Sequence, residues 1–275
     1  MRLKLYLSTL LFLLLLSVSA NAQQTFVYTD AVADQNLHDV GDVFTANDNM
    51  FPQSVAAIDA WRASKKPQSR ISSVGGSYWL IVEIENQSDI EDLVLYPYNT
   101  LVSKIESRIY DLTDVSQPVR SFVTGGVEKN QFAFHYGNRL NLEKGKRYTL
   151  ITHFESDYFY TPAKLVLTPY QDYFEIITLE NVIIMLCFGV GIALGLYNLL
   201  IYLVSKDVTH LYYALFTASW VFAWSHFFHI SDQLFGYYNP HLHWLGFALT
   251  PLTNILFYNN LLKLKETFPK LSQLS

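Results

Sequence analysis

The stretch that decides the architecture of this chain is residues 191–216, GIALGLYNLLIYLVSKDVTHLYYALF. An apolar run stops at Ser205-Lys206-Asp207, and a second apolar run begins almost at once. In full, the first run covers residues 181–204, the second 210–230 and a third 242–262. A helix needs about 20 mainly apolar residues to cross the hydrocarbon of a bilayer. The sequence therefore predicts three transmembrane helices, with the first two joined as a tight hairpin.

Composition narrows the class of protein. The chain has 275 residues, of which 51% are hydrophobic, and its net charge is −5. It has no block rich in lysine or arginine, which argues against a nucleic-acid partner. The single cysteine, Cys187, excludes an intramolecular disulfide framework.

The first 22 residues have the pattern of a signal peptide. Arg2 and Lys4 precede an apolar segment, residues 5–18, and residues 19–22 end in the small-x-small pattern that signal peptidase recognises. We expect cleavage after Ala22, which would place the following residues outside the cytoplasm. An uncleaved membrane anchor is the alternative.

Lysines predict the orientation of the three helices. The connection between the first two spans holds Lys206, the connection at residues 231–241 holds none, and Lys263, Lys265 and Lys270 follow the third span. Cytoplasmic connections carry the excess of positive charge. We therefore expect residues 23–175 to be periplasmic, residues 178–265 to form the membrane region and residues 266–275 to be a cytoplasmic tail. The predicted location is the inner membrane of a bacterium.

Residues 23–175 predict a β-sandwich. Segments such as SYWLIVEIEN (77–86), KIESRIYDL (104–112) and RYTLITHFES (147–156) are rich in aromatic and β-branched residues or alternate with a period of two. QFAFHY (131–136) is a further predicted strand, followed by the turn-forming pair Gly137-Asn138. About eight or nine strands without helical crossovers are typical of an antiparallel sandwich. One short helix is expected at residues 52–64, with Pro52 in its first turn.

Asn198 lies in the middle of the first predicted span, and Gly191 and Gly195 lie on the same span, four residues apart. An amide in hydrocarbon needs a hydrogen-bond partner, and small residues at this spacing let two helices approach closely. We interpret the three residues as helix-packing positions. A ligand or relay function for Asn198 is the alternative.

The order of signal peptide, sandwich and membrane helices resembles the bacterial seven-transmembrane receptors with diverse intracellular signalling modules (7TMR-DISM). The similarity lies in GGSYWLIVEIENQSDIEDLVLYPYN, GKRYTLITHFES and LVLTPYQDYFE of the sandwich, and in GVGIALGLYNLLIYLVSKDVTHLYYALF of the membrane region. The resemblance implies a jelly-roll extracellular domain of the family's second type, related to carbohydrate-binding modules. It also implies a membrane domain that signals to a cytoplasmic kinase or diguanylate cyclase. The chain departs from the family in having three spans and no output module, as expected of a fragment or a truncated gene.

Aromatic and acidic residues near the end of the sandwich are the candidate ligand site. Tyr158 and Tyr160 flank Phe159, and Glu155, Asp157 and His153 lie close by in HFESDYFY. Flat rings stack on sugar C–H faces, and carboxylates accept bonds from sugar hydroxyls. The alternative is that these aromatic side chains belong to the core.

Four histidines and one aspartate are expected to converge at the periplasmic interface: His226, His229, Asp232, His241 and His243. A metal or proton-sensing site is one interpretation, and interfacial side chains that face water and headgroups are the other. Our prediction is that there is no metal site and no cofactor. The sequence has no Walker loop, no G-x-S-x-G and no H-E-x-x-H, so we predict that the protein is not an enzyme.

Two classes of function remain. The first is a membrane-anchored periplasmic sensor that binds a carbohydrate or another small molecule and acts on an output module outside this chain. The second is a non-signalling binding or assembly protein whose helices only anchor the sandwich. Inner-membrane lipids are predicted partners in both cases, and a homodimer is compatible with both.

Overall fold

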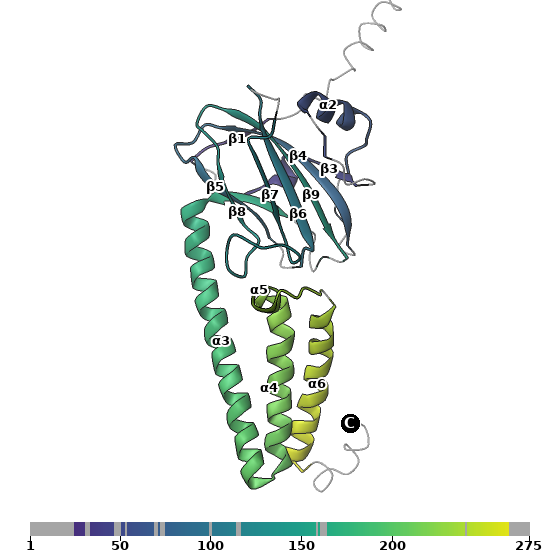
Figure 1. Ribbon diagram of the computed structural model, residues 1–275, viewed down its shortest axis with the longest axis vertical. Helices are drawn as coiled ribbons and strands as arrows, with labels where there is room; N and C mark the ends of the chain where they lie inside the picture. Colours follow the sequence, from purple (N-terminus) through teal and green to yellow (C-terminus); the bar gives the residue numbers. More distant parts are fainter. Residues whose placement is uncertain are drawn as a thin grey trace, which may run out of the picture.

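The computed structural model combines a β-sandwich with a group of helices (Figure 1). The sandwich lies at one end of an elongated molecule, and the longest helix, α3 (Tyr170–Ser205), runs from it alongside the helices that form the other end (Figure 1). The structure describes residues 25–30, 34–46, 51–52, 54–68, 71, 75–98, 101–113, 117–157, 159, 164–239 and 241–263. The predicted signal peptide, its cleavage site and the predicted cytoplasmic tail at residues 266–275 lie outside the described residues.

The larger sheet, sheet A, contains six strands in the order β1-β4-β9-β6-β7, with β3 also paired to β4. Its long central strands pair antiparallel, with Ile81 of β4 opposite Ile151 of β9. The strands are β1 (Phe26–Tyr28), β3 (Asp42–Thr45), β4 (Gly76–Asn86), β6 (Lys104–Asp111), β7 (Arg120–Thr124) and β9 (Arg147–Ser156).

The smaller sheet, sheet B, contains four strands in the order β2-β10-β5-β8. They are β2 (Gln35–Asn36), β5 (Asp92–Pro97), β8 (Asn138–Asn141) and β10 (Leu165–Pro169). A short 3-10 helix, η1 (Leu37–Asp39), follows β2.

The main core lies between the two sheets, because alternate residues of each strand point to the same face. On β4 the buried residues of this core include Leu80, Val82 and Ile84, and on β5 they include Leu93 and Leu95. The period-two alternation therefore builds the predicted sandwich. The structure gives ten strands in the described part of the chain, where about eight or nine were expected.

Helix α2 (Val55–Ala63) covers the outer face of sheet A. Ile58 and Trp61 of this helix pack with Trp79 of β4. The expected helix at residues 52–64 therefore exists, but its start was placed too early. Ser54 is the N-cap, with its side chain accepting a hydrogen bond from the amide of Ala57, so Pro52 lies outside the helix.

Two other expectations about the sandwich were wrong. QFAFHY is a loop rather than a strand, and within it only an isolated bridge joins Phe132 to His135. Asn138 begins strand β8 instead of forming a turn with Gly137. In both places the true neighbour is distant in sequence, since β8 pairs with β5 and the loop lies against helices.

Helix α3 (Tyr170–Ser205) follows β10 without any linker, since β10 ends at Pro169. Its 36 residues extend roughly 54 Å. The predicted first span, 181–204, is the lower part of this helix. The first turns of α3, which precede this span, cover the outer face of sheet B, where Tyr173 and Ile177 pack with Val94. The sandwich thus ends at Pro169, before the expected boundary at residue 175.

The remaining helices are α4 (Val208–Phe227), α5 (Ile230–Phe235) and α6 (Leu242–Leu261). The second predicted span, 210–230, was too long, because the chain leaves the helix after Phe227 and His229 adopts a left-handed conformation with φ of 59°. Helix α5 lies directly under the sandwich, and α4 and α6 run side by side away from it (Figure 1).

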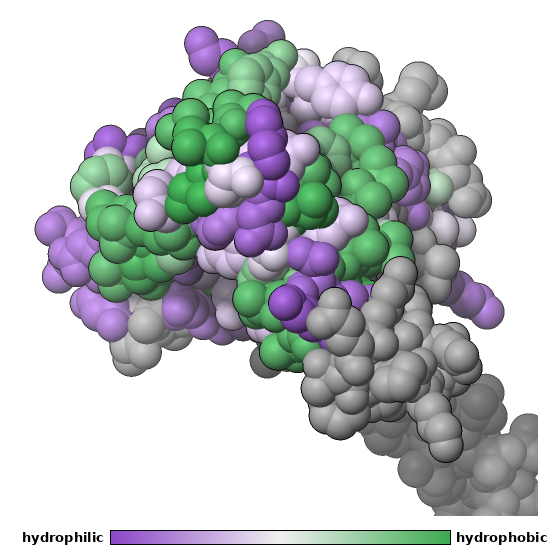
Figure 2. Space-filling model, turned by 90° about the horizontal axis from the view of Figure 1, so that it is seen from below, coloured by the Kyte–Doolittle hydropathy of each residue, from purple (hydrophilic) through white to green (hydrophobic). Residues whose placement is uncertain are grey.

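Among the described residues, α3 is the one helix that is both long and apolar enough to cross a membrane. Helices α4 and α6 match the other two predicted spans in position, but histidine, tyrosine and asparagine lower their hydropathy. Seen from the end farthest from the sandwich, the molecule shows broad hydrophobic areas around a smaller hydrophilic area (Figure 2). Leu186, Leu200 and Val204 are among the exposed apolar side chains of α3.

Candidate functional site

The loop at residues 131–137 of the sandwich is hydrogen-bonded to two helices. Gln233 of α5 accepts a bond from the amide of Phe134 (2.8 Å) and donates one to the carbonyl of Phe132 (3.3 Å). Asn181 of α3 donates to the carbonyl of Ala133 (3.3 Å), and its Oδ1 lies 3.1 Å from Nε2 of His135. We call residues 131–137 the junction loop. It ties the sandwich to both α3 and α5.

Packing reinforces these hydrogen bonds. The ring of Phe134 lies in a cluster with Ile184 of α3, Trp224 of α4 and Ile230 of α5. Phe134 itself has a positive φ of 64°, which is uncommon for a residue with a side chain. The helices therefore hold the junction loop in a conformation that its own sequence does not favour.

A buried polar group lies at the centre of the junction. The hydroxyl of Tyr136 is hydrogen-bonded to Nδ1 of His229, and the carboxylate of Asp232 lies 3.4 Å from the same nitrogen. The side chains of His229 and Asp232 are only 1% and 6% exposed. Burial, with the nearby charge of Asp232, raises the pKa of Tyr136 well above its ordinary value. The tyrosine therefore stays neutral and serves as a hydrogen-bonding group.

Replacing Gln233 with alanine is expected to loosen the junction loop. Two hydrogen bonds to the loop backbone would be lost, each contributing about 0.5–1.5 kcal/mol. Glutamate at this position keeps the acceptor for the Phe134 amide but cannot donate to Phe132, so its effect should be about half as large. Amide hydrogen exchange of the junction loop measures both effects. Gln87→Ala is the control, since the exposed side chain of Gln87 donates to Glu85 and makes no bond to the junction loop in the described structure. Equal protection in all four proteins would contradict this role of Gln233.

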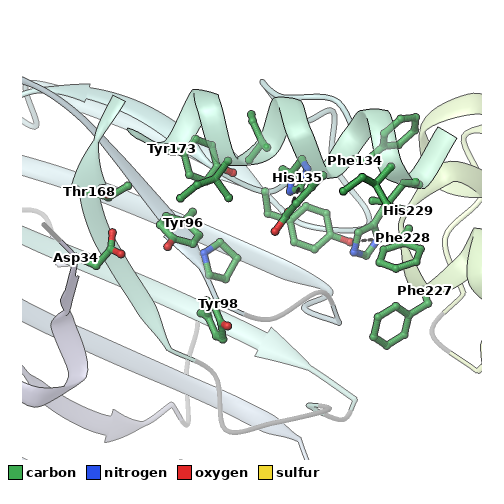
Figure 3. A pocket seen from close by; sticks show the side chains of 17 residues that line it. Asp34, Tyr96, Tyr98, Phe134, His135, Thr168, Tyr173, Phe227, Phe228 and His229 are labelled. Atoms are coloured by element: carbon green, nitrogen blue, oxygen red, sulfur yellow. Dashed lines mark hydrogen bonds and ion pairs between the residues drawn. The ribbon is translucent and has the colours of Figure 1, made fainter. Parts of the chain in front are cut away.

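A cavity of about 720 Å³ lies beside the junction loop. Tyr96 and Thr168 of sheet B line the cavity together with Tyr173 of α3, whose ring lies beside that of Tyr96 (Figure 3). Ile183 of α3 is a further lining residue. Phe227, Phe228 and His229, at the end of α4, close the side nearest the helices. The cavity is therefore bounded by the sandwich and by the helices together.

The structure describes only some of the predicted ligand residues of the sandwich. Tyr158 and Tyr160 lie outside the described residues. Asp157 is exposed and lies 3.8 Å from Nε2 of His241, where α6 is about to begin. Glu155 is partly exposed on β9.

His153 does not join this group. It is 2% exposed, lies against the ring of Trp79 at 4.6 Å and is hydrogen-bonded to Ser77 at 2.7 Å. Its place in the predicted ligand site needs correction, because the neighbouring Phe154 points to the main core and His153 therefore points to the outer face of sheet A. The aromatic cluster under α2 covers that face.

Residues of the predicted helix-packing group lie between α3 and α4. Oδ1 of Asn198 is 2.9 Å from Nδ1 of His210, and its Nδ2 donates to the carbonyl of Leu194. A Cβ built on Gly191 would lie 3.1 Å from Val221, and one on Gly195 would lie 3.6 Å from Thr217.

The closest approach at these helix glycines is at Gly246 of α6, where a Cβ would lie 2.6 Å from the Cα of Ala223. Sequence reasoning missed Gly246, although it is the one glycine of its span.

The four histidines lie at adjoining ends of α4, α5 and α6, and each has a different partner. His226 is hydrogen-bonded to Ser231, His229 contacts Tyr136 and Asp232, His241 faces Asp157, and His243 packs among aromatic rings. Among the residues that the structure describes, no group of three or more His, Cys, Asp or Glu side chains is arranged to hold a metal ion.

Residues 180–275 match the family model described as 7TM diverse intracellular signalling. No curated protein matches the chain. Solved structures similar to this chain include TmCBM61 in complex with beta-1,4-galactotriose, at 11% identity and a TM-score of 0.25, covering 50% of this chain and 86% of that one. Another is TmCBM27, a carbohydrate-binding module studied for mannan recognition, at 12% identity and a TM-score of 0.19, covering 34% and 63%. Scores this low carry no argument about a ligand.

Proposed function

We propose that this chain is the input part of a signalling receptor, because residues 180–275 match the family model described as 7TM diverse intracellular signalling. The sandwich lies in the periplasm and binds a carbohydrate or another small molecule. The helices lie in the inner membrane and pass the conformational change that follows ligand binding to a cytoplasmic output module. The protein acts as a sensor without catalysing a reaction.

The observation that carries this proposal is the way in which the sandwich is joined to the helices. Strand β10 continues directly into α3, and the junction loop is hydrogen-bonded to α3 and α5. A domain that is only anchored needs neither feature, because a flexible linker is sufficient for anchoring. With both features, a displacement of sheet B is expected to move α3 and α5.

One candidate ligand residue of the sandwich, Asp157, lies close to the start of α6. Asp157 is within ion-pair distance of His241, which immediately precedes α6. We propose that Tyr158, Tyr160, Asp157 and Glu155 contact the ligand in this region. A ligand bound here would compete with or reinforce the contact between Asp157 and His241, and so act on α6 as well.

The native cysteine provides a reporter for the test. Cys187 is the only cysteine in the sequence, it is exposed, and it lies on α3 facing the space between α3 and α4. The full chain, labelled at Cys187 with an environment-sensitive fluorophore and placed in lipid nanodiscs, is titrated with a panel of neutral mono- and oligosaccharides. Binding is measured separately by calorimetry. If the chain is the input part of a receptor, the fluorescence change at Cys187 and the calorimetric binding curve should have their midpoints at the same sugar concentration.

Two matched variants separate binding from transmission. Gln233→Ala combined with Tyr136→Phe should bind the sugar with unchanged affinity but give a smaller fluorescence change. Tyr158→Ala combined with Tyr160→Ala should lose binding. If a sugar binds and Cys187 does not respond, the sandwich is only anchored and the alternative function holds. If no sugar in the panel binds, the carbohydrate part of the proposal is wrong.

The proposed orientation has its own test. A periplasm-active reporter fused after Gly236 is expected to be active, whereas the same reporter fused after Lys206 or Lys263 is expected to be inactive. Lysines follow the first and the third span but are missing from the connection between the second and the third, and cytoplasmic connections hold the positive charges. A cytoplasm-active reporter at the same three positions should give the opposite result. An inverted pattern at any position would reject the arrangement of three spans.

A further inference from the structure

The junction cavity has the size and surface of a small-molecule site. Its volume of about 720 Å³ falls within the range of about 300–1,000 Å³ that is usual for such sites. Most of its lining is apolar, with Ile176, Ile183 and Phe228 among the residues that supply hydrocarbon and ring carbon. The cavity is distinct from the exposed segment around Asp157, which does not line it.

The charges at the cavity are all of one sign. Asp34 and Glu180 are its carboxylates, and none of the described residues that line it is lysine or arginine. The pKa of Tyr96 is raised to about 12, first by burial and then by the charges of Asp34, Tyr98 and Glu180, in that order. His135 Nε2 lies 3.9 Å from the carboxylate of Glu180, and burial lowers the pKa of His135 and raises the pKa of Glu180.

Aromatic rings surround the carboxylates. Tyr96 and Tyr173 lie with their centroids 4.8 Å apart, and Tyr98, which is 69% exposed, lies at the rim. The face of an aromatic ring attracts a cation through its quadrupole, by about 0.5–2 kcal/mol depending on exposure. The rings and the carboxylates therefore both favour a cationic ligand and disfavour an anion.

His229 supplies an unused hydrogen-bonding atom. It lines the cavity, its side chain is 1% exposed, and its Nε2 has no hydrogen-bond partner. A buried polar atom without a partner costs stability, and this one lies at the end of the cavity away from Asp34 (Figure 3), so it is not part of the charged end of the site.

We propose that the junction cavity binds a protonated amine with an apolar body, such as an arylalkylammonium ion. The ammonium group lies among Asp34, Glu180 and the tyrosine rings, and the apolar body lies against Ile176, Ile183 and Phe228. This site does not depend on sugar binding by the sandwich. A ligand here touches sheet B, the junction loop, α3 and α4 at once, so it would set how the two parts of the molecule pack.

An ammonium group on an apolar body occurs both in free amines and in the head group of phosphatidylethanolamine. The cavity offers no lysine or arginine among its described lining residues to hold a phosphate, which favours the free amine. Nanodiscs of phosphatidylcholine contain no primary amine, whereas nanodiscs with phosphatidylethanolamine do. Comparing the two separates the sources.

The experiment uses the full chain in phosphatidylcholine nanodiscs and three probes of similar size: phenethylamine, 2-phenylethanol and 3-phenylpropanoate. Binding is measured by calorimetry, with empty nanodiscs subtracted. The amine should bind at least about tenfold more tightly than the alcohol, and the carboxylate should not bind. Glu180→Gln and Asp34→Asn should each weaken amine binding by about threefold or more, without changing alcohol binding. Glu175→Gln, on the exposed face of α3, is the matched control.

Circular dichroism of each variant shows that it is folded. The proposal is wrong if the alcohol binds as tightly as the amine, or if neither carboxylate variant changes the affinity for the amine. If phosphatidylethanolamine in the nanodisc competes with phenethylamine, the lipid head group is the natural occupant of the cavity, and the proposal of a free amine is wrong. These results do not depend on the response of the Cys187 reporter, so the receptor proposal and the cavity proposal can fail separately.

Discussion

Gly246→Ala is expected to destabilise the pair of helices α4 and α6 by about 1–3 kcal/mol. The new Cβ would lie 2.6 Å from the Cα of Ala223 and 2.8 Å from its backbone nitrogen. Backbone atoms cannot rotate away as a side chain can, so the two helices would have to separate. Ala223 is fully buried, which leaves no free space for this movement. Thermal unfolding of the full chain in a non-ionic detergent measures the change.

Gly189→Ala is the matched control, and its effect on stability should have the opposite sign. Nothing lies within 4 Å of a Cβ built on Gly189, and alanine is favoured over glycine inside a helix by about 1 kcal/mol. Gly195→Ala, with an ordinary contact at 3.6 Å, should be close to neutral, and Gly191→Ala should fall between Gly195 and Gly246. A larger loss at Gly195 than at Gly246 would show that the close helix contact lies between α3 and α4 instead.

His229→Asn is expected to destabilise the junction by about 3–5 kcal/mol, because it leaves the buried carboxylate of Asp232 without its partner. Asparagine tolerates the left-handed conformation that residue 229 adopts, so the effect reports the lost imidazole rather than backbone strain. The substitution also removes the hydrogen-bond partner of Tyr136. The free energy of unfolding of the full chain is the quantity to measure.

The double variant His229→Asn with Asp232→Asn makes the test specific. Once the buried charge is also removed, the double variant should be clearly more stable than the sum of the two single losses predicts. His241→Asn with Asp157→Asn is the matched control, since that pair is 66% and 70% exposed and should contribute under about 1 kcal/mol. Strictly additive losses at His229 and Asp232 would mean that the two side chains do not act as a pair.

Local patterns in the sequence predicted the elements that depend on neighbouring residues. The alternation in β4, β6 and β9 predicted strands because side chains of a strand alternate between its two faces. The apolar run of α3 predicted a helix able to cross a membrane, and the structure has that helix. The sequence also predicted the family, which the match of residues 180–275 supports.

The same patterns failed where a distant part of the chain was the partner. The aromatic residues of QFAFHY alternate like those of a strand, yet Phe134 and Tyr136 contact helices about a hundred residues later in the sequence. His153 fits an exposed position by alternation alone, but α2 and the segment before it cover that face of sheet A. Periodicity shows that a residue belongs to one face of an element, but not what covers that face.

The sequence by itself therefore determined the long strands of the sandwich, the long helices and their order along the chain. Only the tertiary structure decided that the sandwich is held to α3 and α5 through the junction loop, and that a cavity with two carboxylates lies between them. The physical reason is the range of the interactions. Secondary structure follows from backbone geometry and residues a few positions apart, whereas the junction depends on pairs such as Tyr136 with His229 and Phe134 with Gln233, which become neighbours only when the whole chain has folded.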